Sequence, residues 1–150
     1  MSRQGETFFT TVGCMDGRAQ ALVAEYGRKK FGAKYPDTIT EAGLVGKLAR
    51  LQLPSQSDGG QAKEEADQGL LDSIKNKLSI SLEKHHSKGI IVHGHQECAA
   101  SDAVEDEKHK DNIRKSVQVI QSLINSSVSV VGVFVKRSSG ESSKWEIEEV

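Results

Sequence analysis

The sequence predicts an α/β fold, with a mostly parallel central sheet of four strands plus a short C-terminal strand and helices on both faces. Apolar, β-branched segments of strand length alternate along the chain with longer segments whose apolar residues recur at helical spacing. The apolar segment Ile90–Gly94 lacks any polar alternation, which is typical of a parallel strand covered on both faces. Alternating strands and helices form right-handed βαβ units, and these build a parallel sheet.

Length and charge limit the class of protein. The 150 residues predict one domain, 1–150, large enough to bury about two thirds of its unfolded surface without a disulfide or a structural metal. The 20 basic and 21 acidic side chains give a net charge of −1, which favours neither nucleic acid nor an anionic membrane as a partner. Because the sequence has no run of 18 apolar residues and no long signal core, we expect an intracellular, cytoplasmic protein.

The first part of the chain predicts two strands and one helix. Thr7–Gly13 is aromatic and β-branched and ends directly at Cys14, so it predicts the first strand. Ala19–Lys30 has apolar residues at helical spacing, although Gly27 weakens that helix. Tyr35–Thr40 predicts a turn that leads into a short second strand.

Predicted helices and strands also alternate in the rest of the chain. Leu53–Gly60 is rich in Pro, Ser, Asp and Gly and predicts a mobile loop. A continuous apolar stripe then predicts a helix from about Lys63 to Lys84. A buried strand follows at Ile90–Gly94, and an apolar stripe predicts a helix at Ile113–Ile124. The chain then continues with a β-branched strand at Val128–Val135, a turn within Lys136–Lys144 and a short last strand at Trp145–Ile147.

Both cysteines of the chain stand where metal ligands would. Cys14 follows the first predicted strand, and His95 and Cys98 follow the third. Ligands of parallel sheets bind at the carboxyl ends of the strands, so Cys14 and His95 meet if their strands are neighbours. Cys98 would reach the same ion from the first turn of the next helix. Two thiolates and one imidazole suit a catalytic zinc site with an open fourth position, whereas a Cys14–Cys98 disulfide is disfavoured inside a cell.

Asp16 and Arg18 lie beside the first cysteine. Zinc lowers the pKa of a bound water to about 7 and so supplies hydroxide, a nucleophile for an electrophilic carbon such as that of carbon dioxide. Asp16 would accept a hydrogen bond from the hydroxide and orient it. Arg18 would hold the carboxylate by a two-pronged contact and keep it out of the open metal position. The alternative is that Asp16 caps a helix and Arg18 is solvated.

The motif Cys-x-Asp-x-Arg followed by Gly-His-x-x-Cys resembles the β-class carbonic anhydrases, and the order of the elements is similar over most of the chain. The resemblance implies that Cys14, His95 and Cys98 bind Zn²⁺ and that Asp16 and Arg18 form the catalytic dyad. It implies a lyase activity, the reversible hydration of carbon dioxide to bicarbonate.

Several positions depart from that family's usual pattern. Gly17 replaces a serine, Glu41 replaces an asparagine, and Ala99–Ala100 replaces two glycines. Only 13 residues precede Cys14, so we expect the family's long amino-terminal arm, which wraps a dimer partner, to be absent. We expect the unusually long span between the two motifs to lie in a Gln52–Lys63 loop.

Two other functions remain open. One is hydrolysis of carbonyl sulfide or carbon disulfide, activities that occur on the same scaffold. The other is zinc binding without catalysis, with a role in binding or regulation. In each case we expect a homodimer, because exposed strand edges and an apolar pocket wall need to be covered.

The remaining histidines have weaker signals. His93 precedes His95 by two residues and so points to the same side of the strand, where it could shuttle protons or bind metal. A buried, hydrogen-bonded role for His93 is the favoured interpretation. We expect His85, His86 and His109 to lie on helix surfaces.

Overall fold

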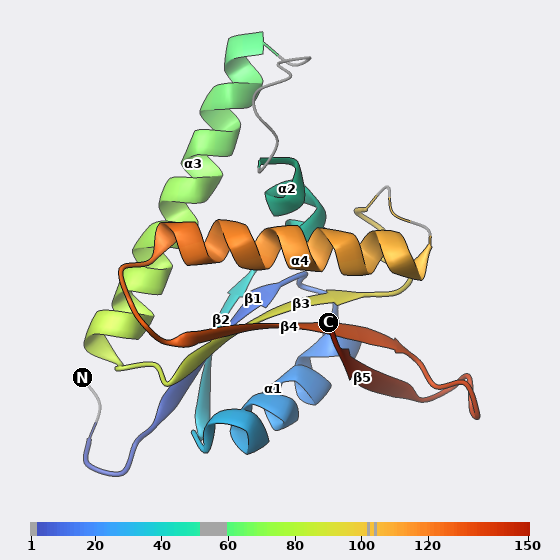
Figure 1. Cartoon of the computed structure of the whole chain (residues 1–150), viewed down its shortest axis with the longest axis horizontal. Coiled ribbons are helices and arrows are strands. Elements are labelled where there is room, and N and C mark those ends of the chain that lie inside the picture. Colours follow the sequence, from blue (N-terminus) through green and yellow to red (C-terminus); the bar gives the residue numbers. More distant parts are fainter. Residues whose placement is uncertain (1–2, 52–59, 102, 104) are drawn as a thin grey trace.

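The computed structural model describes residues 3–51, 60–101, 103 and 105–150. At its centre lies a five-stranded sheet in the order β2-β1-β3-β4-β5 (Figure 1). The first four strands in that order are parallel, and β5 pairs with β4 in the antiparallel direction. The strands span Phe8–Gly13 (β1), Tyr35–Thr40 (β2), Gly89–His95 (β3), Ser129–Arg137 (β4) and Trp145–Glu149 (β5). The predicted mostly parallel sheet with a short C-terminal strand is therefore confirmed.

Helices cover both faces of the sheet, as predicted (Figure 1). One face carries α1, and the other carries α2, α3 and α4. The helices span Gly17–Phe31 (α1), Leu44–Leu51 (α2), Gly60–Ser79 (α3) and Asp106–Leu123 (α4), and a π-helical turn, η1 (Ile80–Lys84), continues α3. The helix α2 was not predicted from the sequence. In the described part of the chain, no helix is long and apolar enough to cross a membrane.

Two apolar layers, one on each face, hold the helices to the sheet. The larger layer joins Ile90 and Val92 of β3 to Ile113 and Ile120 of α4, all without solvent exposure. The smaller layer packs α1 around Phe9 of β1. Every residue of β3 is buried, as the lack of polar alternation predicted.

The largest difference from the predicted elements lies at the start of α3. This helix begins at Gly60, so the end of the predicted Gln52–Lys63 loop is helical. Residues 52–59, which hold most of the segment predicted to be mobile, lie outside the described residues. The helical path ends at Lys84, as predicted, but its last five residues form the π-helical turn.

The strand order brings the ends of β1 and β3 together. The chain passes from β1 to β2 on one side and then to β3 on the other, so the order switches at β1. Parallel sheets bind ligands at the carboxyl edge beside such a switch. Gly13 pairs with His93 in the register, and a Cβ on Gly13 would lie 2.4 Å from the His93 ring. Only glycine therefore permits this close approach just before Cys14.

Candidate metal centre

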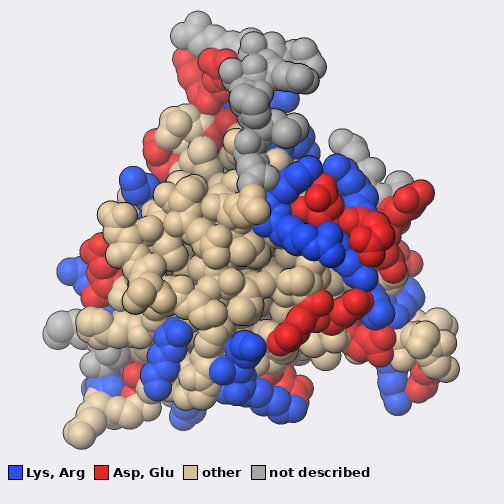
Figure 2. Space-filling view, viewed as in Figure 1, with Lys and Arg blue, Asp and Glu red and all other residues tan. Residues whose placement is uncertain are grey.

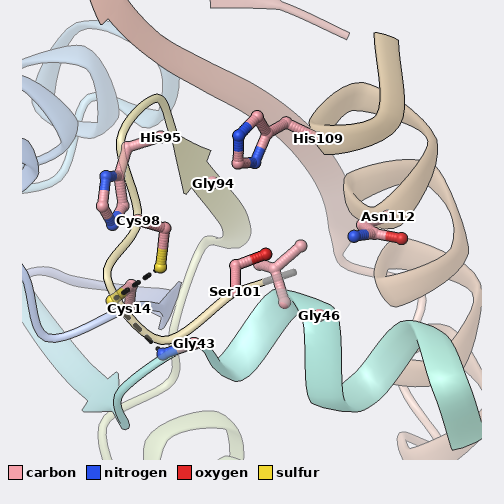
Figure 3. Close-up of a pocket in the computed structure, with 10 residues that line it drawn as sticks. Cys14, Gly43, Gly46, Gly94, His95, Cys98, Ser101, His109 and Asn112 are labelled. Atoms are coloured by element: carbon pink, nitrogen blue, oxygen red, sulfur yellow. Dashed lines mark hydrogen bonds between the residues drawn. The ribbon is translucent and has the colours of Figure 1, made fainter. Parts of the chain in front are cut away.

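The side chains predicted to bind metal converge at the carboxyl edge of the sheet (Figure 3). Cys14 follows β1, His95 ends β3, and Cys98 lies in the next loop. One ligand atom from each lies within 4.8 Å of the other two. The two sulfur atoms are 3.8 Å apart, too far for a disulfide bond of about 2.05 Å. Thiolates at about 2.3 Å from a tetrahedral zinc ion lie about 3.8 Å apart, so this spacing fits a shared ion.

Cys98 reaches the site by an unexpected route. The expectation that it lies on the first turn of the following helix is wrong, because α4 begins only at Asp106. The chain reverses instead through Gln96 and Glu97, and Glu97 has a left-handed φ of 56°. The side chain of Gln96 donates to Asp106 and accepts from the Arg137 N–H, both at 2.8 Å. These bonds anchor the loop that presents Cys98.

The hydrogen bonds of His95 leave one nitrogen for a metal. Nδ1 lies 2.7 Å from the carbonyl oxygen of Gln96, so Nδ1 carries the hydrogen and donates it. Nε2 therefore holds the lone pair, and it is buried without a hydrogen-bond partner among the described residues. A buried lone pair without a partner is costly, and a metal ion would satisfy it.

The two sulfur atoms have different surroundings. The backbone N–H of Gly43 donates to the Cys14 sulfur at 3.4 Å. Gly43 has a φ of 65°, and a Cβ there would lie 2.5 Å from the Ala100 carbonyl oxygen, so glycine is needed. Burial raises the pKa of the Cys98 thiol, and nearby Cys14 raises it further. A bound dication would reverse both effects.

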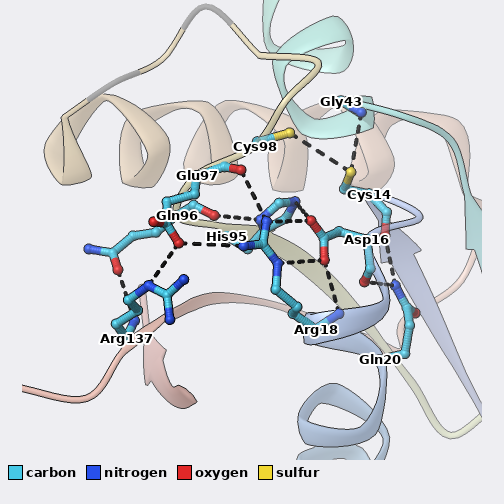
Figure 4. A network of polar contacts seen from close by, with 10 residues as sticks. All are labelled: Cys14, Asp16, Arg18, Gln20, Gly43, His95, Gln96, Glu97, Cys98 and Arg137. Carbon is cyan, nitrogen blue, oxygen red and sulfur yellow. Dashed lines mark hydrogen bonds and ion pairs between the residues drawn. The ribbon is translucent and has the colours of Figure 1, made fainter. Parts of the chain in front are cut away.

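Asp16 and Arg18 form a two-pronged ion pair beside the three ligands (Figure 4). Asp16 Oδ1 accepts from Arg18 Nε at 3.0 Å, and Oδ2 accepts from Nη2 at 2.7 Å. Asp16 also caps α1 by accepting the Arg18 backbone N–H at 2.9 Å. The hydrogen bonds from Arg18 lower the pKa of Asp16 to about 2. The cap and the ion pair thus occur together, with Asp16 Oδ2 3.8 Å from His95 Nε2.

Arg18 has further partners that the sequence analysis missed. Its Nη2 donates to the Glu97 carbonyl oxygen at 3.2 Å, and its guanidinium lies 4.9 Å from the centre of the Trp145 ring. Arg137 lies 4.6 Å from the same ring centre and donates to Glu97 Oε2 at 2.9 Å. Trp145 and Glu97 therefore hold both arginines around the loop after β3.

Gln20 fixes the loop between β1 and α1. Its side-chain amide donates to the carbonyl oxygens of Cys14 and Asp16, both at 2.9 Å. This residue was also missed, because a glutamine in the first turns of a helix carries no distinctive signal.

A small cavity lies between the three predicted ligands and two helices (Figure 3). Its volume for the centre of a water-sized sphere is about 20 Å³, room for one or two waters. The wall opposite the ligands consists of Val45, Gly46, Ser101, His109 and Asn112. The expectation that His109 lies on a helix surface is wrong, because it is 5% exposed and packs its ring on Phe134. Burial lowers the pKa of His109, and His95 lowers it further.

The other histidines do not line this cavity. His93 is fully buried, as favoured, but neither ring nitrogen has a hydrogen-bond partner among the described residues. Burial lowers its pKa to about 4. His85 is half-buried, stacks on Phe8 and pairs with Asp37 at 2.8 Å. His86 is exposed, as expected, but it lies two residues beyond the end of η1 and not on a helix.

Glu41, which replaces the asparagine usual in the family, does not line the cavity. Its carboxylate lies 3.4 Å from the Lys47 ammonium group, and it is not among the cavity residues. Its backbone N–H donates to the Gly13 carbonyl oxygen at 3.2 Å. Glu41 thus supports the loop beneath the site.

Comparison with known families agrees with this geometry. The family described as "Putative carbonic anhydrase" matches residues 4–150. The chain belongs to this carbonic anhydrase family. The family match therefore confirms the carbonic anhydrase resemblance that was predicted from the motifs. No curated protein sequence matches the chain.

The carbonic anhydrase fold is confirmed by a solved structure. The chain resembles the β-carbonic anhydrase CafA of the fungal pathogen Aspergillus fumigatus, with a TM-score of 0.50 and 10% sequence identity. The match covers 97% of this chain and 76% of that chain.

Proposed function

We propose that this member of the carbonic anhydrase family binds Zn²⁺ through Cys14, His95 and Cys98 and interconverts carbon dioxide and bicarbonate. The observation that carries the proposal is a set of three donor atoms within 4.8 Å of one another, beside an Asp16 carboxylate whose two oxygens are both held by Arg18. Two thiolates and a neutral imidazole suit zinc and leave a fourth position for chemistry. Membership of the family supports the same activity.

The residues of the chain have separate roles in this reaction, in which carbon dioxide and water give bicarbonate and a proton. Cys14, His95 and Cys98 would hold the zinc ion, which when bound would supply hydroxide at neutral pH by lowering the pKa of a coordinated water to about 7. Asp16, with a pKa of about 2, stays ionised and accepts a hydrogen bond from the nucleophile, which directs its lone pair toward the carbon. Arg18 occupies both carboxylate oxygens and so prevents Asp16 from taking the nucleophile's place.

The size of the cavity favours a substrate of few atoms. A volume of about 20 Å³ suits a small linear molecule such as carbon dioxide. Carbonyl sulfide and carbon disulfide have the same linear shape, so both belong in the substrate assay.

The test is stopped-flow hydration of carbon dioxide by zinc-loaded protein between pH 6 and 9. We expect Arg18→Ala and Asp16→Asn each to lose about a hundredfold or more in kcat/KM while zinc stays bound, the usual scale for removing one positioned acid–base group. In the first variant the free carboxylate competes for the metal, and in the second the amide orients the nucleophile poorly. Arg28→Ala, at the far end of α1, is the matched control and should keep full activity.

Metal analysis tests the ligands separately. We expect one zinc per chain in the parent and a clear loss in Cys98→Ser. Less than half an equivalent in the parent would reject the ligand set. A zinc-loaded parent that hydrates no carbon dioxide would instead leave a zinc-binding protein without this activity.

A further inference from the structure

Two polar side chains of α4 face the metal cavity from the side opposite the predicted ligands (Figure 3). His109 and Asn112 are three residues apart and therefore lie on the same side of the helix. They are only 5% and 9% exposed. Within residues 3–51, 60–101, 103 and 105–150, neither side chain has a hydrogen-bond partner. Their polar atoms are not among the fully enclosed ones that lack a partner, and both residues line the cavity, so they can bind water or a ligand there.

The chemistry of this wall indicates the kind of ligand. The Asn112 amide, a His109 ring N–H and the Ser101 hydroxyl can all donate hydrogen bonds. The Ser101 oxygen accepts the Ala103 N–H at 3.1 Å, which leaves its own hydrogen available. Among the described residues that line the cavity there is no Asp or Glu. Several donors without a carboxylate, beside a cation site, suit a small oxyanion.

The same wall opens onto a wider groove between α2 and α4. Gly46, Ser101 and Asn112 line both the cavity and this groove, whose volume is about 230 Å³. The basic residues of the groove are Arg50, Lys108 and Lys115. The two lysines share the carboxylate of Asp111, at 3.9 and 2.8 Å, so positive charge is in excess. Figure 2 shows Lys and Arg gathered where α2 and α4 meet, with some Asp and Glu among them.

We propose that His109 and Asn112 form an oxyanion subsite that binds bicarbonate, and that the basic groove is its route to and from the metal cavity. This inference rests on the proposed function, because bicarbonate is one partner of that reaction. A donor wall would hold the bicarbonate oxygens as their negative charge develops. Positive charge along the groove would raise the local concentration of the anion.

The test is a titration of cobalt(II)-substituted protein with sodium bicarbonate, followed by the visible spectrum of the metal. Asn112→Asp places a negative charge in the subsite, and Asn112→Ala removes the donor without adding charge. We expect both to weaken bicarbonate binding about ten- to a hundredfold, the usual range for losing a hydrogen bond to a charged group. Asn76→Asp, the same change on the exposed side of α3, should bind as the parent does.

Equal bicarbonate affinity in the parent and the Asn112 variants, with equal cobalt content and circular dichroism, would overturn the subsite. No spectral response in the parent would do the same. If carbon dioxide hydration is absent but the Asn112 variants still bind bicarbonate more weakly, the proposed function fails and the subsite stands. If hydration is normal and the variants bind and turn over as the parent does, the subsite alone fails.

The route is tested with the double variant Arg50→Gln/Lys115→Gln. We expect weaker bicarbonate binding at low ionic strength and a smaller difference in 0.5 M salt, where charges are screened beyond about 4 Å. Lys29→Gln/Lys75→Gln removes two charges from α1 and α3 and is the matched control. No difference between the two double variants at any salt concentration would reject the groove as the route.

Discussion

At the scale of single residues, the position of Arg18 depends on more than its ion pair with Asp16. The flat guanidinium lies against the Trp145 ring, and Arg137 lies against the same ring. Exposed contacts of this kind contribute about 0.5–1 kcal/mol each. In the proposed reaction Trp145 would be a positioning residue that acts only through Arg18.

Trp145→Leu should lower kcat for carbon dioxide hydration about two- to tenfold, because Arg18 loses the surface that orients it. Zinc content should not change, since Trp145 is not one of the predicted ligands. Stopped-flow assays with metal analysis measure both quantities. Trp145→Phe keeps an aromatic face and should restore most of the rate, and failure of that rescue would argue against positioning by the ring.

His93 predicts a dependence of stability on pH. Its folded-state pKa of about 4 lies below the ordinary 6.5, because burial disfavours the charged ring. The unfolded chain therefore takes up the proton first, and stability is lost as the pH falls from 6.5 toward 4. One pKa unit corresponds to about 1.4 kcal/mol, so the full contribution is about 3 kcal/mol.

Urea unfolding of the metal-free protein at pH 7, 6, 5 and 4 measures this effect. His93→Leu should show a smaller fall in the free energy of unfolding over that range than the parent. His86→Asn, which changes an exposed histidine, should follow the parent. If the parent and His93→Leu have parallel pH profiles, His93 is not buried in its neutral form.

At the scale of elements, α1 approaches the sheet closely because of one glycine. A Cβ on Gly27 would lie 2.0 Å from the Phe9 ring. From the sequence, Gly27 was expected only to weaken the helix. In the structure, the absence of a side chain on Gly27 leaves room for the Phe9 ring. Gly69 in α3 is the contrasting case, because a Cβ there would meet no atom within 4 Å.

These two glycines predict opposite effects of the same substitution. Gly69→Ala should raise the free energy of unfolding by about 0.5–1 kcal/mol, since alanine is the better helix former. Gly27→Ala should lower it by about 1–3 kcal/mol, because the methyl group overpacks the interface with β1. Denaturant unfolding measures both, and stabilisation by Gly27→Ala would contradict the close packing of α1.

At the scale of the whole molecule, the buried core is large enough for the protein to fold without a bound metal. The two apolar layers cover both faces of the sheet, and the three predicted ligands lie at one edge of it. We therefore expect the metal-free protein to keep its far-ultraviolet circular dichroism. Zinc at a thousandfold excess over its Kd should add about 4 kcal/mol, seen as a higher Tm that a chelator abolishes. Unfolding on removal of zinc would assign the metal a structural role.

The edges of the sheet support the expectation of a homodimer. Within the described part of the chain β2 pairs only with β1, and Tyr35 on this strand is 39% exposed. The unpaired N–H and C=O groups of a strand edge can pair with a second chain. Light scattering at micromolar concentration should give twice the mass of one chain, and the mass of a single chain would reject the dimer.

The strands and the positions of the predicted ligands along the chain could be predicted from the sequence. The segments before Cys14 and His95 have the composition of strands, and parallel strands present their carboxyl ends at one edge. The sequence did not show that these two strands are neighbours. The predicted helix began at Ala19, with Asp16 as its cap only as the alternative to the dyad, whereas α1 begins at Gly17 and Asp16 both caps it and pairs with Arg18. The strands themselves depend on neighbours in sequence, so local patterns were sufficient to predict them.

The surroundings of those residues depend on contacts between elements that are far apart in sequence. The turn at Glu97 that returns Cys98 to the site depends on bonds from Gln96 to two other elements. The burial of His109 depends on where α4 crosses the sheet, and the contact of Arg18 with Trp145 joins the two ends of the chain. Contacts between residues far apart in sequence leave no periodic pattern, because each is created by the packing of whole elements.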